Sequence, residues 1–289
     1  MIIDSHAHYN NHAYRKPFRY LTYGEDGYAL REGERDQLFR ELLDADIPYS
    51  IEPGVSLESC REVLELAAQF PGRIFPAIGI HPTRSIFERW PDRKKLAEYA
   101  NTPGVIAIGE IGLDYHYKRE EQHRLTQYLW FLYQLNLAWK RKLPVILHVR
   151  DAHEDALRIL RWHPARKMGG VIHCFYGSKE IAEQYLKLGY HIGIGGSALQ
   201  LEEQAQDLWG AIPHIPLERI LLETDAPFIL PYCKNVIQPK LLRRARNTSL
   251  ILPAVIEKIA ELKGISADEV EQATTENTIR LFHLPIRET

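Results

Sequence analysis

Short runs of apolar residues alternate with longer amphipathic segments from one end of the chain to the other. Most of these runs stay apolar until their final residues, which is typical of parallel strands that are buried on both faces. The runs predict eight β-strands, at residues 2–8, 47–54, 74–82, 105–114, 143–150, 169–177, 189–196 and 219–227.

The segments between the predicted strands have helical patterns. The longest of them, 119–141, has an apolar stripe made of Leu125, Leu129, Leu132 and Leu135. Ser56 is predicted to cap the helix that follows it. Asp151, with Glu154 as its capping-box partner, is predicted to cap the helix around ALRIL.

The repeated alternation of strand and helix over 289 residues favours an α/β protein with a (β/α)₈ TIM-barrel fold, which uses about 250 residues as one domain. A doubly wound sheet is the alternative, but no GxGxxG motif follows the first strand. No composition break marks a linker, so we expect a single domain over 1–289. Residues 9–33 are long for a loop after a barrel strand, and we expect a functional or partly disordered loop there.

Composition narrows the class of protein. No apolar stretch is long enough to span a membrane and none resembles a secretory signal, so a cytoplasmic location is the default prediction. Cys60, Cys174 and Cys233 form no CxxC pair, which argues against a disulfide framework or a thiolate zinc site. The net charge of −2 excludes a polycation, so nucleic acid would have to bind local basic patches. Nothing predicts an obligate protein partner.

Polar residues close several of the predicted strands. Because the carboxyl ends of barrel strands converge on one mouth, we expect these side chains to meet there. Side chains alternate along a strand, so His6 and His8 share a face, as do Glu223 and Asp225. The strand-closing residues are His6, His8, Glu110, Asp114, His148, His173, Glu223 and Asp225.

Several imidazoles and carboxylates in one apolar mouth favour metal binding, because without a cation the buried charges and unpaired donors are costly. Mixed nitrogen and oxygen ligands suit Zn, Mn, Fe or Co. Glu110 can bridge two ions, whose shared water becomes a hydroxide nucleophile near neutral pH, and Asp225 can take or orient its proton. Glu223, on the same face, is a candidate proton-shuttling group. Taken singly, each of these histidines or carboxylates could instead be an ordinary polar cap.

The same residues lie in stretches that resemble the TatD-like metal-dependent deoxyribonucleases. The matching stretches are DSHAH (4–8), AIGIHP (77–82), AIGEIGLDY (107–115), PVILHVRDA (144–152), GGVIHCFYGS (169–178), GYHIGIGG (189–196), RILLETDAPFILP (219–231) and TTENTIRLF (274–282). The resemblance implies a C-terminal helix at 266–282. It also implies a two-metal hydrolase that degrades DNA, commonly as a 3′-to-5′ exonuclease on single strands or frayed ends.

For the ligands, the resemblance implies that His6, His8 and Asp225 bind one ion and that His148 and His173 bind the other. Glu110 falls at the bridging position. The ions expected are two divalent cations, with Zn, Mn and Mg as candidates. The chain departs from the family at Asn10, where a carboxylate is usual, and at 247–249, where Asn-Thr-Ser replaces Asn-x-Pro.

Two local patches favour a DNA substrate, because cations near phosphates and aromatic rings near bases suit a single-strand groove. One lies in the loop after the first strand and contains Arg15, Lys16, Phe18, Arg19 and Tyr20. The other follows the eighth strand and contains Lys234, Lys240, Arg243, Arg244 and Arg246. Further predicted substrate contacts are His81, His116 and Arg150. His12 and His153 are interpreted as surface residues. A small-molecule amidohydrolase, esterase or phosphotriesterase with the same metals, and a non-catalytic metal-binding protein, remain alternatives.

Overall fold

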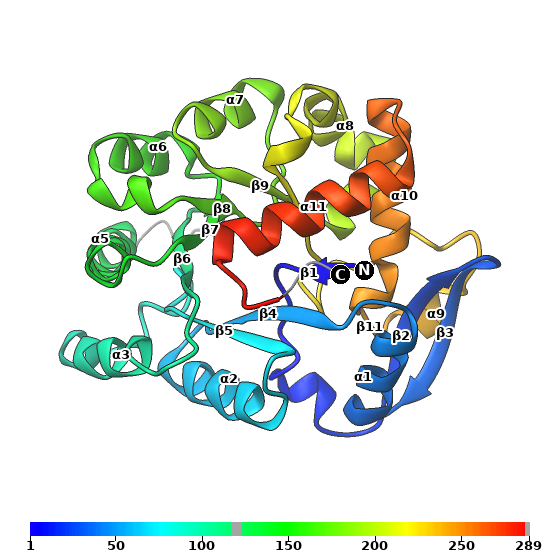
Figure 1. Cartoon of the computed structure of the whole chain (residues 1–289), viewed down its shortest axis with the longest axis horizontal. Coiled ribbons are helices and arrows are strands. Elements are labelled where there is room, and N and C mark those ends of the chain that lie inside the picture. Colours follow the sequence, from blue (N-terminus) through cyan, green and yellow to red (C-terminus); the bar gives the residue numbers. More distant parts are fainter. Residues whose placement is uncertain (117–122, 287–289) are drawn as a thin grey trace.

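The computed structural model describes residues 1–116 and 123–286, and within them one sheet of eight parallel strands forms the centre of the molecule (Figure 1). Every predicted strand overlaps one of its members, so the TIM-barrel prediction is confirmed. In sheet order, the strands are β1 (Ile3–Asp4), β4 (Tyr49–Pro53), β5 (Ile74–Ile78), β6 (Ala107–Asp114), β7 (Val145–Arg150), β8 (Gly170–Ile172), β9 (His191–Ile194) and β10 (Ile220–Leu222).

Hydrogen bonds beyond the ends of β1 and β10 join the first and last strands of the sheet. The Ser5 amide donates to the Leu222 carbonyl (2.8 Å), and the His8 amide donates to the Ala226 carbonyl (2.7 Å). Ala7 forms an isolated parallel bridge with Ala226. The segment with the two N-terminal histidines therefore lies directly beside the segment with Asp225.

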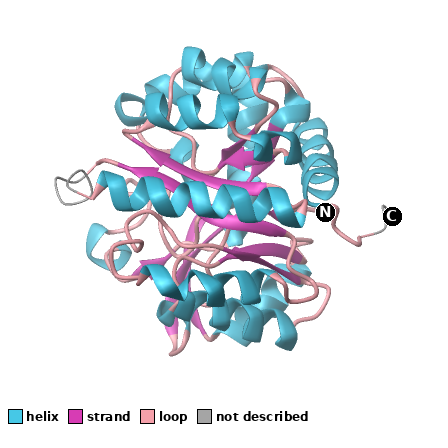
Figure 2. Ribbon diagram, turned by 90° about the vertical axis from the view of Figure 1, so that its left-hand side faces the viewer, coloured by secondary structure: helices cyan, strands magenta, loops and turns pink. Residues whose placement is uncertain are grey.

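Helices cover the outer face of the strands (Figure 2). The α-helices are α1 (Arg35–Asp44), α2 (Leu57–Gln69), α3 (Arg93–Ala100), α5 (Arg124–Arg141), α6 (His153–Trp162), α7 (Lys179–Lys187), α8 (Glu202–Ala211), α9 (Pro239–Leu242), α10 (Leu252–Lys263) and α11 (Ala267–Phe282). The 3₁₀ helices are His12–Tyr14, Trp90–Asp92, Pro164–Met168, Gly196–Leu199, Ile212–His214, Leu217–Arg219 and Ser249–Ile251. None of the helices in the described residues has the length and apolarity that crossing a membrane requires.

The predicted C-terminal helix is confirmed as α11, which Ser266 caps by accepting a hydrogen bond from the Glu269 amide. In Figure 1 this helix runs across the end of the barrel where the chain begins. Leu281 and Phe282 at its end, together with Leu284, pack against the inward side chains of the strands. The bottom of the barrel is therefore apolar and closed.

Alternation along the strands converts this apolar interior into a polar mouth. Ile146, Val171 and Leu221 belong to the interior cluster. Two residues further along the same strand faces come polar side chains, namely His148, His173 and Glu223. The candidate site therefore lies directly on top of the packed core, at the carboxyl ends of the strands.

The expectation of a loop over the whole of 9–33 is wrong for residues 18–33. Strands β2 (Phe18–Gly24) and β3 (Gly27–Gly33) form an antiparallel hairpin, and β11 (Ala245–Arg246) pairs with β2 in a small three-stranded sheet. Gly27 adopts φ 82°, which suits the tight turn between the strands. The aromatic side chains of β2 are mostly buried, so they stabilise this sheet rather than a substrate groove.

Two details of the predicted helices also need correction. Leu125 and Leu129 are 71% and 45% exposed, because α5 turns a different face inward. That face includes Gln127 and Gln134, whose side chains bond the backbone at Asp114 and Ile80. Residues 119–122 of the helix predicted at 119–141 lie outside the residues that the structure describes.

The Ser56 cap is confirmed, because its hydroxyl accepts a hydrogen bond from the Ser59 amide. The Asp151 cap is wrong. Helix α6 starts after Ala152 without a side-chain cap, and the Asp151 carboxylate instead lies 2.8 Å from His116 Nδ1.

Candidate metal centre

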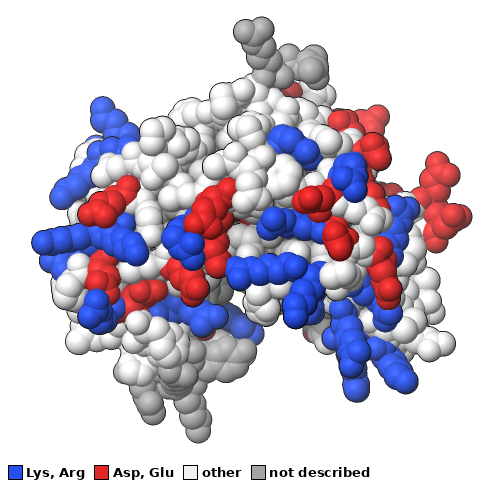
Figure 3. Space-filling model, turned by 90° about the horizontal axis from the view of Figure 1, so that it is seen from below, with Lys and Arg blue, Asp and Glu red and all other residues white. Residues whose placement is uncertain are grey.

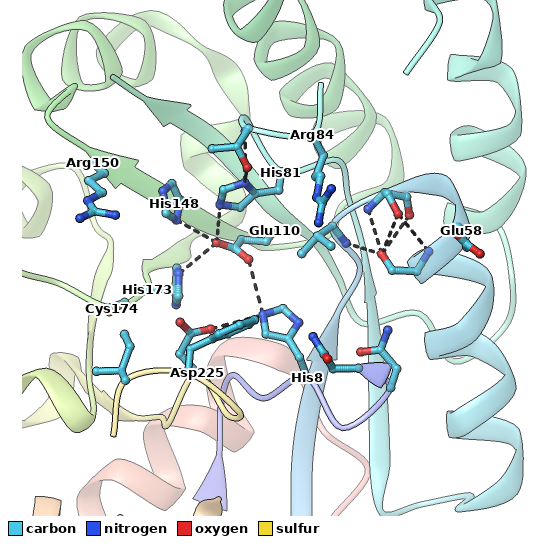
Figure 4. A pocket seen from close by; sticks show the side chains of 18 of the residues that line it. His8, Glu58, His81, Arg84, Glu110, His148, Arg150, His173, Cys174 and Asp225 are labelled. Atoms are coloured by element: carbon cyan, nitrogen blue, oxygen red, sulfur yellow. Dashed lines mark hydrogen bonds and ion pairs between the residues drawn. The ribbon is translucent and has the colours of Figure 1, made fainter. Parts of the chain in front are cut away.

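The predicted ligands converge at the mouth of the barrel, around the Glu110 carboxylate. Figure 4 shows His8, His148, His173 and Asp225 around it. They lie on or just after strands β1, β6, β7, β8 and β10. A cavity of about 1310 Å³ opens above them. Three groups of ligand atoms, each within 4.8 Å of one another, link the cluster: His6, Glu110 and His173; His6, His8 and Asp225; His81, Glu110 and His148.

The first set of ligand atoms comes from the segments after β1 and β10, which lie side by side where the first and last strands of the sheet meet. His6 Nε2 and His8 Nε2 are 3.1 Å apart, and Asp225 Oδ1 lies 3.3 Å from His8 Nε2 and 3.7 Å from His6 Nε2. Two nitrogens that bind one tetrahedral zinc ion at about 2.1 Å are separated by roughly 3.4 Å. The spacing of the two imidazoles therefore fits ligands of one shared cation.

The second set surrounds the other side of Glu110. His148 Nδ1 lies 2.9 Å from Glu110 Oε1, and His173 Nε2 lies 3.0 Å from the same oxygen. The other oxygen, Oε2, lies 3.5 Å from His6 Nε2 and 3.7 Å from His8 Nε2. Each oxygen of this carboxylate therefore faces a different set of imidazoles.

His81, which the sequence predicts as a substrate contact, belongs to this cluster as well. Its Nε2 is 3.3 Å from Glu110 Oε1, and its ring makes an edge contact with His148 at 4.2 Å between centroids. The signal was present in the sequence, since His81 closes the predicted third strand as the other histidines close theirs.

Two of the inner histidines are oriented by a hydrogen-bond acceptor on their other nitrogen. His8 Nδ1 lies 3.2 Å from the Pro53 carbonyl, and His148 Nε2 lies 2.9 Å from Asp114 Oδ2. His173 Nδ1 lies at ion-pair distance from Glu223 Oε1, 3.4 Å, without a hydrogen bond. Such outer acceptors fix the tautomer and ring orientation of a metal-binding imidazole. The sequence predicts Asp114 only as a strand-closing residue, and the structure gives it this contact.

Glu223 is buried behind His173 rather than open to the cavity. Its carboxylate accepts a hydrogen bond from the Cys174 amide, and the residue is 1% exposed. Gly193 packs directly against the carboxylate, where a Cβ atom would collide with it. This surrounding favours a role in holding His173.

The charges of the cluster depend on one another. Burial would raise the pKa of Glu110, but the neighbouring His81 and His173 hold it well below its usual range. Burial likewise acts to raise the pKa of Asp225, but the hydrogen bond with His8 and the charges of His173, His8 and His6 together lower it. Burial and the charge of His173 lower the pKa of His6. Buried carboxylates kept ionised beside imidazole nitrogens are a donor set that divalent cations fit.

The backbone of the first ligand pair is held from below by Asp4. Its carboxylate accepts hydrogen bonds from the His6 amide (3.1 Å), the Thr224 hydroxyl (2.6 Å) and the Ser249 hydroxyl (2.6 Å). Burial raises the pKa of Asp4 to about 7, although these hydroxyls act in the opposite direction. Ser249 ends the Asn-Thr-Ser segment, so that departure from the family pattern has a structural role here.

The predicted substrate contacts divide into two groups. His116 and Arg150 line the cavity, as does Arg84, which sequence reasoning missed. Lys234, Arg243 and Arg244 are not among the described residues that line it, so their contact with a substrate stays a prediction from the sequence.

The first basic patch is also only partly at the cavity. Arg15 lines it and pairs with Glu62 at 2.5 Å, but Phe18 and Tyr20 are buried.

On the face seen in Figure 3, basic and acidic side chains are intermixed, in keeping with the low net charge. Exposed His12 lines the cavity, whereas His153 is half-buried against the Tyr185 hydroxyl.

A parallel barrel with imidazoles and carboxylates gathered at the carboxyl ends of its strands is the architecture of a metal-dependent hydrolase. Comparison with known proteins agrees with this class. The model of the family described as TatD related DNase matches residues 3–283. The chain therefore belongs to the TatD related DNase family, a family of metal-dependent hydrolases and nucleases.

Individual relatives cover almost the whole chain. The metal-dependent hydrolase YabD of Bacillus subtilis is 30% identical over 284 residues, which is 98% of this chain and 100% of that protein. The 3′-5′ ssDNA/RNA exonuclease TatD of Erwinia billingiae is 34% identical over 87% of this chain and 94% of its own. Among solved structures, the TatD homologue YJJV of Escherichia coli has a TM-score of 0.81 at 29% identity and covers 98% of both chains.

Proposed function

We propose that this enzyme hydrolyses phosphodiester bonds in single-stranded nucleic acid, foremost DNA, with two divalent ions bound at the mouth of the barrel. The observation behind the proposal is the division of the Glu110 carboxylate between two sets of imidazoles. Oε1 faces His81, His148 and His173, and Oε2 faces His6 and His8. This arrangement would suit a carboxylate shared between two divalent ions.

In this assignment the ligands follow the sequence prediction. His6, His8 and Asp225 would hold one ion, His148 and His173 would hold the other, and Glu110 would be shared between them. His81 adds a further nitrogen on the Oε1 side of Glu110. The imidazole-rich set favours Zn or Mn over Mg. Such ions, when bound, supply an activated water and stabilise the charge that develops on phosphorus.

The carboxylates of the chain have separate tasks. Asp225 lines the cavity, its side chain is 17% exposed, and the His8 contact favours its ionised form, so it is our candidate for accepting a proton. Glu223 keeps the His173 ring in place, since both its depth and its contacts favour positioning over proton transfer.

Two arginines at the cavity provide positive charge for the substrate. Arg84 follows β5 and Arg150 ends β7, and in Figure 4 they lie on opposite sides of Glu110. No salt bridge of Arg84 is found with any described residue. Guanidinium groups bind phosphate oxygens in a bidentate manner, so we assign this pair to the backbone of the substrate.

The choice of nucleic acid rests on the relatives. Several carry the name 3′-5′ ssDNA/RNA exonuclease at 33–35% identity, over 87–88% of this chain. We therefore propose digestion from a 3′ end, of single strands or frayed duplex ends. A cytoplasmic location stays a prediction from the sequence.

The proposal is tested with a single-stranded oligonucleotide labelled at its 5′ end. The purified enzyme is incubated with Mg²⁺, Mn²⁺ or Zn²⁺, with and without chelator. We expect stepwise shortening that the chelator abolishes and that is faster than on a blunt duplex. Parallel assays with an aryl ester, a lactone and a phosphotriester address the small-molecule alternative. Turnover of one of these without any shortening of DNA or RNA would contradict the proposal.

A further inference from the structure

The cavity above the metal centre is lined by aromatic rings that stay exposed to solvent. Among the described residues they are Phe87 (59% exposed), Tyr176 (45%) and Phe228 (51%). They follow β5, β8 and β10 respectively. Single exposed aromatic residues are common on protein surfaces, so exposure alone does not assign them a role.

Phe228 contacts the metal centre directly. Its ring makes an edge contact with the ring of His8, at 6.1 Å between centroids and an interplanar angle of 67°. Its amide donates to the Asp225 carbonyl at 2.8 Å. The exposed ring is therefore attached to the turn that supplies one predicted ligand, and it touches another.

The turn that bears Phe228 is fixed by the buried side chain of Asn247. The Asn247 amide group donates to the carbonyls of Thr224 (2.9 Å) and Ile229 (3.2 Å). The Asn247 backbone N–H donates to the Pro227 carbonyl at 3.1 Å. Hydrogen bonds thus hold the backbone on both sides of Phe228, whose ring is about half exposed to solvent. A ring held in this way loses little freedom when a ligand covers it.

We propose that Phe228 stacks on the base of the nucleotide next to the phosphodiester at the metal centre, and that the site selects unpaired nucleotides through this contact. This inference rests on the proposed nuclease function. Every base has a flat face, so stacking tolerates any sequence, whereas a base inside a duplex has its faces covered by neighbours. With Arg84 and Arg150 at the same cavity, cations for phosphates and a ring for a base occur together.

The test compares two single-stranded oligonucleotides that differ only at the 3′ end. One has normal nucleotides there, and the other has abasic residues at the last two positions. The ratio of kcat/KM on the two substrates is measured for the wild type and for Phe228→Leu and Phe228→Trp. Trp162→Leu is the matched control, because Trp162 is 87% exposed but does not line the cavity.

We expect the wild type to prefer the normal oligonucleotide by about tenfold, as the loss of one stacked base predicts. Phe228→Leu should lower the ratio to near one, whereas Phe228→Trp and Trp162→Leu should keep it. A 2-aminopurine at the 3′ terminus gives a second readout, since its fluorescence is quenched on stacking and Phe228→Leu should reduce that quenching.

Two failures are distinguishable. If the wild type cleaves both oligonucleotides but Phe228→Leu keeps the wild-type ratio, the stacking role is overturned and the nuclease function stands. If the wild type cleaves neither with any of the metals, the proposed function itself is wrong, and this inference is overturned with it.

Discussion

Two buried histidines on neighbouring strands, His173 and His191, have opposite surroundings. His173 follows β8 at the mouth, beside Glu110 and Glu223, and burial is outweighed there, so that its pKa is raised well above the usual value. His191 begins β9 at the other end of the barrel. There burial, together with the charges of Arg219 and Arg280, lowers its pKa to about 4.

The comparison shows that burial alone does not make a histidine part of a functional site. At the closed end of the barrel, a single imidazole is kept neutral within the apolar packing and contributes to the fold. At the mouth, carboxylates are placed against imidazoles at a cost in stability that a cation offsets. The following predictions use this difference between the two ends of the barrel.

The largest effect is expected from Glu110→Gln. Loss of the bridging charge should reduce nuclease activity by about 10³-fold or more, since a metal centre supplies several kcal/mol to the transition state. The fold should persist, as judged by circular dichroism. His191→Gln is the matched control at the other end of the barrel, and it should keep its activity at pH 7. Full activity in Glu110→Gln would refute the bridging role.

A smaller loss is expected when an outer acceptor is removed. In Asp114→Ala the His148 ring loses the partner of its Nε2, and metal affinity should fall about 10- to 100-fold. Titration of the metal-free protein with Mn²⁺ or Zn²⁺ measures this change. Asp92→Asn, on the surface beside Arg89, is the control. Equal affinity in wild type and Asp114→Ala would show that His148 needs no such support.

We predict that His191, at the closed end of the barrel, makes the folded state less stable in acid. Because its pKa is lowered to about 4 in the folded state, unfolded chains bind more protons below pH 6.5, and stability falls as the pH drops towards 4. The variant His191→Gln lacks this titrating group. When the pH is lowered from 7 to 5, the free energy of unfolding should therefore fall by about 2 kcal/mol more in the wild type than in His191→Gln. Urea titrations at both pH values measure the difference, and parallel pH dependences would contradict it.

The smallest effect is expected from the cavity arginine. Arg84→Ala should raise KM for single-stranded DNA about three- to tenfold and make its salt dependence shallower by roughly one counterion, with kcat little changed. Arg243→Ala, in the basic segment that does not line the cavity, should leave KM as it is. A larger effect from Arg243 than from Arg84 would instead favour the second basic patch as the substrate contact.

Much of the fold follows from the sequence because barrel strands are continuous apolar runs that end in polar residues. The same pattern places His6, Glu110 and His148 together at one mouth. It does not predict the inner face of α5, because Gln127 and Gln134 are buried there for their backbone hydrogen bonds, and a search for apolar stripes passes over them. It does not predict the hairpin at 18–33 either, because a mixture of aromatic, glycine and charged residues is also typical of a loop.

The sequence predicts the candidate site incompletely for the same reason, since some of its contacts depend on the folded structure. Charge and position after the eighth strand predict Lys234 and Arg243 as substrate contacts, but whether such a segment turns toward the mouth depends on tertiary packing. The sequence does not predict a role for Phe228, because its place beside His8 in the folded structure is what distinguishes it from other exposed aromatic residues.

The central claim, that the mouth is a centre for two ions organised around Glu110, is tested most directly by counting metal. Purified wild type and Glu110→Gln are saturated with Mn²⁺ or Zn²⁺, freed of excess ions, and analysed for metal per chain by mass spectrometry. We predict two ions per wild-type chain and at most one in Glu110→Gln. One ion or none in a wild-type enzyme with full, chelator-sensitive activity, or two ions retained by Glu110→Gln, would contradict the claim.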